Sequence, residues 1–336
     1  MGGGIIVGIE STAHTLSIGS VNAHGEPSSS HSAFFRPKIG GIHPREAADH
    51  HASMAGSLVK KLLDSGVVPS DVEAIAFSQG PGLGPCLRVG ASIARALGSK
   101  WKVPIVGVNH CVAHIEIGRQ QCGMDDPVLL YVSGGNTQVI ARMAGRYRVL
   151  GETLDIGIGN MLDKFAREHE LPFPGGPKIE TLAGEWHEQN PDADLDNLAL
   201  PYAVHGMDLA FSGTYTAACR LTQRGEPLGG ACWSLQEHSF AACIEVAERA
   251  MAHTGKTELL LGGGVACNKR IREMSHLMTE ERGGTCGVPP PQFCVDNGSM
   301  IATLGQLQLH HSGPTDLLSS AVNQGLRTDQ TTIYWD

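Results

Sequence analysis

The sequence predicts an α/β protein built from two similar lobes. Residues 5–21 are typical of a short apolar strand, a polar turn and a second strand, and residues 128–143 repeat this arrangement. Glycine-rich turns follow apolar strands at 8–12, 132–136 and 261–268. Because glycine lets the main chain approach a phosphate closely, these turns favour a nucleotide held in a cleft between the two lobes.

The first half alternates between the two kinds of element. A helix is expected over 45–65, where Leu58 and Leu62 lie one turn apart, and a second helix over 86–100. The remaining elements give the order strand, strand, strand, helix, strand, helix, strand, helix over residues 1–121.

The second half begins with the repeated strand pair and then departs from the first. Residues 151–225 are expected to form a largely helical insertion. Strand 258–264 and helices over 233–254, from 267 and over 297–311 complete this half, and a polar extended tail follows.

Composition excludes several classes of protein. Charged residues make up 18% of the 336 residues, below the usual ~25%, which argues against disorder. The 25 basic and 34 acidic residues give a net charge of −9. The sequence has no run of basic residues that would indicate nucleic-acid binding. Nine cysteines without C-x-x-C spacing, no signal-like start and no apolar run of ~18 residues predict a cytoplasmic protein with reduced thiols and no membrane partner.

The histidine pair His110 and His114 lies four residues apart on a predicted helix, so both imidazoles share one face. A chain with 16 histidines forms such a pair easily by chance, and a core or solvated pair is the commoner explanation. Cys111 occupies the position at which a zinc-protease motif needs glutamate. The pair alone therefore does not establish a metal site.

Longer motifs carry a resemblance over nearly the whole chain. They are SQGPGLG (78–84), GVNHCVAHIEIG (107–118), YVSGGNTQV (131–139), GETLDIGIGNMLDKFAR (151–167), LGGGVACNKR (261–270) and FCVDNGSMIA (293–302). In this order they resemble the universal tRNA threonylcarbamoyladenosine transferase family. HPREAADHH (43–51) and Tyr131 are most similar to its archaeal and eukaryotic branch, the catalytic subunit of the KEOPS complex.

The resemblance implies an actin/Hsp70/sugar-kinase-like ATPase fold of two ribonuclease-H-like lobes with a nucleotide cleft. We expect an N-terminal lobe over 1–125 and a C-terminal lobe over 126–296 that carries the insertion 151–225. Residues 297–336 are expected to form a helix and tail that pack back on the N-terminal lobe.

The resemblance also implies site residues. The metal ligands would be His110, His114, Tyr131 and Asp296, a nitrogen and oxygen set that suits iron best, with zinc or magnesium as alternatives. The contacts to an ATP- or AMP-type nucleotide would come from Tyr131, Val132, Ser133, Gly134, Gly135, Asp163, Gly176, Glu180 and Asn268. Without the motifs, each carboxylate would be read as a surface residue or a helix cap.

The implied reaction is a transfer of the threonylcarbamoyl group from threonylcarbamoyl-adenylate to a tRNA. The acceptor would be the exocyclic amine of the adenosine 3′ of the anticodon in ANN-decoding tRNAs, with AMP released. Glu10 is a candidate general base, and it is equally typical of a turn residue that binds main-chain amides. The expected partners are the tRNA and KEOPS-type subunits: a kinase-like ATPase, a dimerising subunit and a tRNA-binding subunit.

Two alternatives remain at this stage. One is a carbamoyltransferase or small-molecule kinase of the same fold, which would leave the two histidines unexplained. The other is a non-enzymatic, nucleotide-dependent scaffold, which would need no metal.

Overall fold

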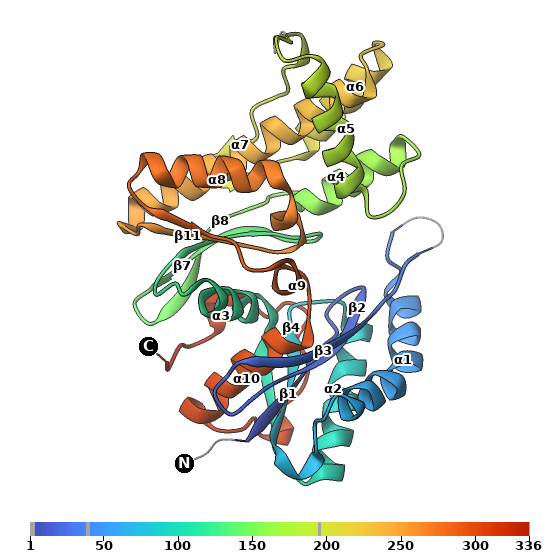
Figure 1. Ribbon diagram of the computed structural model, residues 1–336, viewed down its shortest axis with the longest axis vertical. Coiled ribbons are helices and arrows are strands. Elements are labelled where there is room, and N and C mark those ends of the chain that lie inside the picture. Colours follow the sequence, from blue (N-terminus) through green and yellow to red (C-terminus); the bar gives the residue numbers. More distant parts are fainter. Residues whose placement is uncertain (1–3, 38–40, 194–195, 336) are drawn as a thin grey trace. The chain divides into compact units, whose positions relative to one another are not determined.

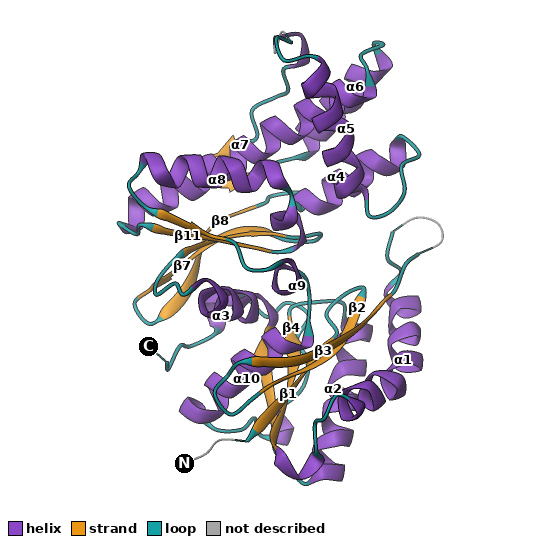
Figure 2. Ribbon diagram, viewed as in Figure 1, coloured by secondary structure: helices purple, strands orange, loops and turns teal. Residues whose placement is uncertain are grey.

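The computed structural model describes residues 4–37, 41–193 and 196–335, and these form two compact units. Unit 1 comprises the described residues up to Gln120, Met143–Tyr147 and those from Val295 onward. Unit 2 comprises Gln121–Arg142 and the described part of Arg148–Cys294. Figure 1 labels their elements and Figure 2 separates helices from strands.

Unit 1 is built on a five-stranded sheet with the order β3-β2-β1-β4-β5. Its strands are β1 (Ile5–Glu10), β2 (Thr15–Val21), β3 (Pro27–Phe34), β4 (Val72–Gly80) and β5 (Ile105–Asn109). Its helices are α1 (Pro44–Asp64), α2 (Gly84–Trp101), α3 (His110–Cys122) and α10 (Gly298–Ser312), with short 3-10 turns η1 (Pro69–Asp71), η4 (Leu317–Ser319) and η5 (Thr328–Gln330). The strands β1, β2 and β3 form an antiparallel meander, and β4 and β5 continue parallel to β1.

Strand β1 shows how the two faces of this sheet are used. Val7 and Ile9 are fully buried in a core with Leu58 and Leu62 of α1. Between them, Gly8 faces α10, and a Cβ atom there would lie 2.2 Å from the carbonyl oxygen of Gly298. Because successive strand residues point to opposite faces, α10 and α1 cover opposite sides of the sheet.

Unit 2 repeats this sheet with the order β12-β11-β6-β7-β8. Its strands are β6 (Val128–Val132), β7 (Thr137–Met143), β8 (Arg146–Glu152), β11 (Glu258–Gly262) and β12 (Thr285–Gly287), with a separate pair β9 (Val204–His205) and β10 (Asp208–Leu209). Its helices are α4 (Ile158–Glu168), α5 (Gly175–Gln189), α6 (Ser212–Gln223), α7 (Leu228–Thr254), α8 (Lys269–Glu281) and α9 (Pro291–Cys294), with 3-10 turns η2 (Asp196–Leu198) and η3 (Gly264–Cys267).

The two sheets have the same plan. In each, an antiparallel pair starts the unit, and two later strands add in parallel on the other side of the first strand. The α/β class and the duplicated strand pairs predicted from the sequence are confirmed.

Two strands of unit 2 were missed, and the predicted start of one helix was wrong. The meander of unit 2 has a third strand, β8, that the sequence reasoning missed, together with the short edge strand β12. The helix expected from Cys267 is a 3-10 turn followed by α8, because the side chain of Asn268 accepts the N–H of Arg270 and caps the helix one residue later. None of the helices in the described residues is both long and apolar enough to span a bilayer.

Candidate functional site

Three predicted metal ligands lie together in unit 1. His114 Nε2 is 3.2 Å from Asp296 Oδ1, and His110 Nε2 is 3.6 Å from the same oxygen. The two imidazole rings are 4.8 Å apart between centroids and nearly perpendicular. Both histidines are buried, while Asp296 keeps 19% of its side chain exposed, so the cluster has one accessible side.

Local sequence explains how these ligands are presented. Asn109 ends β5, and its Oδ1 accepts the N–H groups of Cys111 at 2.9 Å and Val112 at 3.2 Å, which starts α3. His110 therefore occupies the first turn of the helix, and His114 follows one turn later on the same face. Asn297 caps α10 by accepting the N–H of Met300 at 2.9 Å, which places Asp296 immediately before that helix.

Glu10 supports the histidine pair from β1. It is fully buried, its Oε2 lies 2.9 Å from His110 Nδ1, and its Oε1 accepts the N–H of Thr12 at 2.6 Å. A carboxylate that holds Nδ1–H of an imidazole orients the ring so that Nε2 can face a metal, an arrangement common behind metal-binding histidines. Both carboxylate oxygens accept hydrogen bonds, which suits an orienting role for Glu10, and its role as a general base stays a prediction.

The charges within the cluster depend on each other. Burial alone would lower the pKa of His110, but the carboxylates of Glu10 and Asp296 outweigh it and raise the pKa to about 9. Burial lowers the pKa of His114. Burial disfavours the ionised form of Asp296, yet the two histidines hold the pKa of its carboxyl well below the usual range.

The donor set fits a divalent ion. Metal–nitrogen and metal–oxygen bonds of about 2.0–2.2 Å place neighbouring tetrahedral ligands roughly 3.3–3.6 Å apart, close to the separations found here. His110, His114 and Asp296 offer ligand atoms that all lie within 4.8 Å of one another. Tyr131, the fourth predicted ligand, is buried in β6 of unit 2, and its part in metal binding stays a prediction.

The predicted nucleotide contacts all belong to unit 2, and the first group is the turn between β6 and β7. The N–H of Gly159 donates to the carbonyl of Ser133 at 3.1 Å, and the N–H of Asn160 donates to that of Gly134 at 3.0 Å. A Cβ atom on Gly157 would lie 2.5 Å from the carbonyl oxygen of Gly134, so this position excludes larger residues. The turn therefore rests directly on the first turn of α4.

Asp163 connects α4 to the start of α5. Its Oδ1 accepts the N–H of Gly175, the first residue of α5, at 2.7 Å. Gly176 follows, and a Cβ atom there would meet only the end of Leu162 at 3.9 Å. The start of α5 is thus fixed by a carboxylate while the space beside Gly176 stays open.

Glu180 and Asn268 connect α5 to the start of α8. Glu180 Oε1 accepts the N–H of Lys269 at 2.8 Å. Asn268 is buried, and besides capping α8 it donates from Nδ2 to Gln236 Oε1 at 2.8 Å. Gly263 has a φ of +91°, and a Cβ atom added there would lie 2.3 Å from the Val132 carbonyl oxygen.

These contacts gather the predicted residues at one end of the sheet. The parallel strands β6 and β11 both end there, and α4, α5 and α8 begin there. In open α/β sheets, ligands bind at the carboxyl ends of parallel strands, and helix N-termini favour anions such as phosphate. The unit 2 residues share this end of the sheet, and their contact with a nucleotide stays a prediction.

Sequence reasoning missed several supporting residues. Gln236 lies in the middle of α7, and a glutamine in a helix gave no signal that it would contact Asn268. His51 of α1 is fully buried and its Nε2 lies 3.1 Å from the carbonyl of Ala13, which holds the turn after Glu10. The motif HPREAADHH contained it, but only the fold shows this contact.

Cys267, which precedes Asn268, has unusual electrostatics. The neighbouring Cys294 thiol, with help from Arg272, lowers the pKa of Cys267 to about 6, against the effect of burial. A half-buried thiolate at the start of a helix is the usual environment of a nucleophilic cysteine.

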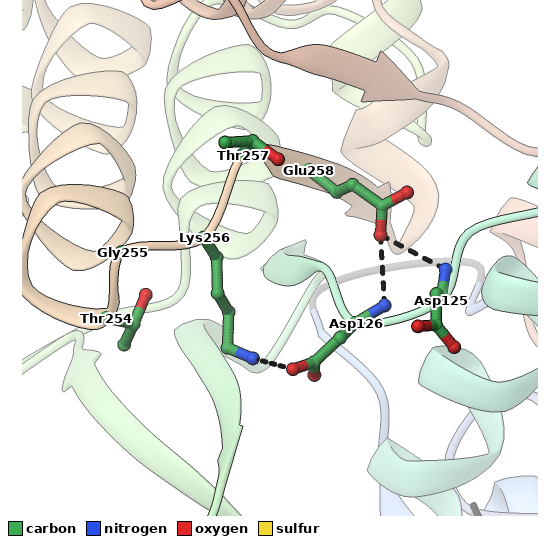
Figure 3. A pocket seen from close by; sticks show the side chains of 7 residues that line it. All are labelled: Asp125, Asp126, Thr254, Gly255, Lys256, Thr257 and Glu258. Carbon is green, nitrogen blue, oxygen red and sulfur yellow. Dashed lines mark hydrogen bonds and ion pairs between the residues drawn. The ribbon is translucent and has the colours of Figure 1, made fainter.

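A surface pocket also lies in unit 2, away from these residues (Figure 3). It is lined by Asp125, Asp126 and residues 254–258. Lys256 binds Asp126, and Glu258 Oε2 accepts the N–H groups of Asp125 and Asp126 at 3.1 and 3.0 Å (Figure 3). These residues lie where β6 and β11 begin, at the opposite strand ends from the candidate nucleotide site, so we assign no function to the pocket.

Comparison with curated proteins gives close relatives. The chain is 52% identical to the tRNA N6-adenosine threonylcarbamoyltransferase of Thermococcus kodakarensis over 335 residues, covering 99% of this chain and 100% of that protein. It is 52% identical to a probable bifunctional tRNA threonylcarbamoyladenosine biosynthesis protein of Methanocorpusculum labreanum over 305 residues, 91% of this chain and 56% of that protein. The chain thus spans somewhat more than half the length of the bifunctional relatives it matches.

Solved structures support the fold alone. The HypF structure from T. kodakarensis matches 92% of this chain and 48% of that chain, with a TM-score of 0.63 at 14% identity. The activator of 2-hydroxyisocaproyl-CoA dehydratase from Clostridium difficile matches 90% of this chain and 94% of that chain, with a TM-score of 0.54 at 10% identity. These similarities agree with the ATPase-type α/β fold expected from the motifs.

The sequence profile of the TsaD family, described as tRNA N6-adenosine threonylcarbamoyltransferase, matches residues 28–303. This range includes all four predicted metal ligands and all the predicted nucleotide contacts, while the candidate base Glu10 lies before it. The chain therefore belongs to the tRNA N6-adenosine threonylcarbamoyltransferase family.

Proposed function

We propose that this chain transfers the threonylcarbamoyl group from threonylcarbamoyl-adenylate to a tRNA adenosine. The exocyclic amine of the adenosine 3′ of the anticodon attacks the carbamoyl carbon, a new C–N bond forms, and the bond to the phosphate oxygen breaks to release AMP. The observation that carries the proposal is the buried cluster of His110, His114 and Asp296 in a chain of this family. A small-molecule kinase, the main alternative, gives this cluster no role.

His110, His114 and Asp296 would hold one divalent ion, with Tyr131 as a further candidate ligand. Two imidazoles and a carboxylate suit iron or zinc better than magnesium, which prefers more oxygen ligands, and we propose iron. When bound, such an ion supplies a Lewis acid for a phosphate or carbonyl oxygen. Glu10 holds the Nδ1–H of His110 and so keeps its Nε2 available.

The residues of unit 2 would hold the AMP part of the donor. Backbone of the 133–135 turn and the starts of α5 and α8 would face the phosphate, where the helix dipoles favour negative charge. Asp163 and Glu180 each use one oxygen to fix a helix start, and the second oxygen of Glu180 would accept a ribose hydroxyl. Orientation by these groups is the main contribution that the chain makes to the transfer.

The tRNA and the partner subunits are part of the same proposal. With a net charge of −9 and no basic run, the chain offers few groups for phosphate contacts. We propose that KEOPS-type subunits supply the basic surface, and that the chain alone binds tRNA weakly at physiological salt.

The test is the variant His114→Ala in anaerobically purified protein. Loss of one of the ligands should remove bound metal, measured by elemental mass spectrometry, and should abolish transfer, measured by nucleoside mass spectrometry with adenylate donor, tRNA and partner subunits. His253→Ala, which removes an exposed histidine from α7, is the matched control and should keep both. Full metal content together with full activity in His114→Ala would overturn the assignment.

A further inference from the structure

The C-terminal segment Arg327–Trp335 runs beside α3, the helix that carries His110 and His114. At the start of α3, Asn109 Nδ2 donates to the carbonyl of Arg327 at 3.1 Å. Near its other end, Glu116 Oε1 accepts the indole N–H of Trp335 at 2.9 Å. The segment therefore contacts one residue before the histidine pair in the sequence, Asn109, and one residue after it, Glu116.

Glu116 is the stronger of these two attachment points. It is only 4% exposed, and three donors surround its carboxylate: Tyr147 Oη at 2.5 Å, Trp335 Nε1 at 2.9 Å and Arg119 Nη1 at 3.0 Å. Tyr147 and Trp335 are themselves almost fully buried. Removing a donor would leave buried charge poorly compensated, which makes the arrangement costly to break.

The tail reaches Glu116 because a second segment holds it. Thr332 pairs with Arg146, and the N–H of Ile333 donates to the carbonyl of Gly145 at 3.3 Å. Tyr147 follows at the start of β8 and donates its hydroxyl to Glu116. Residues 143–147, where β7 turns into β8, and the tail thus both contact α3 at the Glu116 carboxylate, and the tail has a second contact at Asn109.

Glu116 follows His114 by two residues, so its side chain leaves α3 on a different side from the histidines. The histidines face Glu10 and Asp296, and Glu116 faces the tail. Helix α3 is therefore held from two directions, and its rotation or translation would move both imidazoles relative to Asp296.

We propose that the C-terminal segment is a positioning element for the metal site, with Glu116 and Trp335 as its positioning residues. The inference rests on the proposed metal-dependent function. It adds that metal affinity depends on contacts made by residues that are not among the proposed ligands.

The test uses Trp335→Phe, which keeps an aromatic ring and removes the N–H donor, and Glu116→Gln, which keeps the shape and removes the charge. Trp101→Phe is the matched control, since Trp101 is a half-buried tryptophan in the same unit, at the end of α2. Zn²⁺ affinity is measured on the full chain by competition with a chromophoric chelator. Hydrogen exchange of the α3 amides is measured on the same metal-free proteins.

Both Glu116→Gln and Trp335→Phe should weaken Zn²⁺ binding about threefold to tenfold, less than the 10–100-fold typical for direct partners of a ligand. Both should also speed exchange in α3, while Trp101→Phe should change neither. Unchanged Zn²⁺ affinity would overturn the positioning role, whatever the exchange shows. If the wild-type chain bound neither Zn²⁺ nor, under anaerobic conditions, Fe²⁺, the proposed metal-dependent function would fail instead. Unchanged exchange in α3 would overturn the attachment of the tail to this helix.

Discussion

The buried Asn268 allows a structural role and a binding role to be separated by two substitutions at one position. Its Oδ1 caps α8 at 2.8 Å, and its Nδ2 donates to buried Gln236 at 2.8 Å. Loss of a cap costs about 1 kcal/mol, and an unsatisfied buried acceptor costs about 1–3 kcal/mol. We therefore expect Asn268→Ala to lower the free energy of unfolding by roughly 2–4 kcal/mol.

Asn268→Asp should behave differently. Aspartate caps a helix as well as asparagine does, and the Gln236 amide can turn to donate to it, so stability should stay within about 1 kcal/mol of the wild type. If the nucleotide phosphate lies beside this cap, the added carboxylate should weaken AMP binding by about 1–3 kcal/mol, roughly 5- to 150-fold.

Urea unfolding and calorimetry with AMP check the two expectations separately. Asn190→Asp adds the same charge to an exposed position at the end of α5 and should leave AMP affinity unchanged; it controls for AMP binding alone, because it also removes the bond from Asn190 Nδ2 to the Trp186 carbonyl. Wild-type stability in Asn268→Ala would show that the cap and the Gln236 bond contribute little. Wild-type AMP affinity in Asn268→Asp would refute the placement of the phosphate.

Two further predictions follow from packing and from charge. Gly8→Ala should lower the free energy of unfolding by about 1–3 kcal/mol, because its Cβ atom would meet the main chain of α10 at 2.2 Å. Gly56→Ala is the control and should not lower this free energy, since no atom lies within 4 Å of the added Cβ. Equal urea midpoints for the two variants would contradict this prediction. The rate of Cys267 alkylation should rise through pH 6 and level off near pH 7, because the neighbouring Cys294 side chain favours the Cys267 thiolate. Peptide mass spectrometry that finds this rate still rising at pH 9 would contradict the prediction.

Much of the site was readable from the sequence because its signals are local. Four-residue spacing put His110 and His114 on one helix face, and glycines after apolar strands marked the turns of unit 2. The long ordered motifs then identified the family, and with it Asp296, which no spacing rule connects to residue 110.

What the sequence alone could not supply were contacts between residues far apart in the chain. The contacts of Glu10 with His110 and with the N–H of Thr12 could not be read from the sequence, which left a base and a turn residue as equal alternatives. The partner of Asn268 and the attachment of Trp335 to Glu116, 219 residues away, have no signature in composition or periodicity. Periodicity reports which side of its own helix or strand a residue occupies. The packing of the elements decides which distant side chain that residue contacts. Buried polar groups need hydrogen-bond partners, and this requirement applies only once the chain has folded.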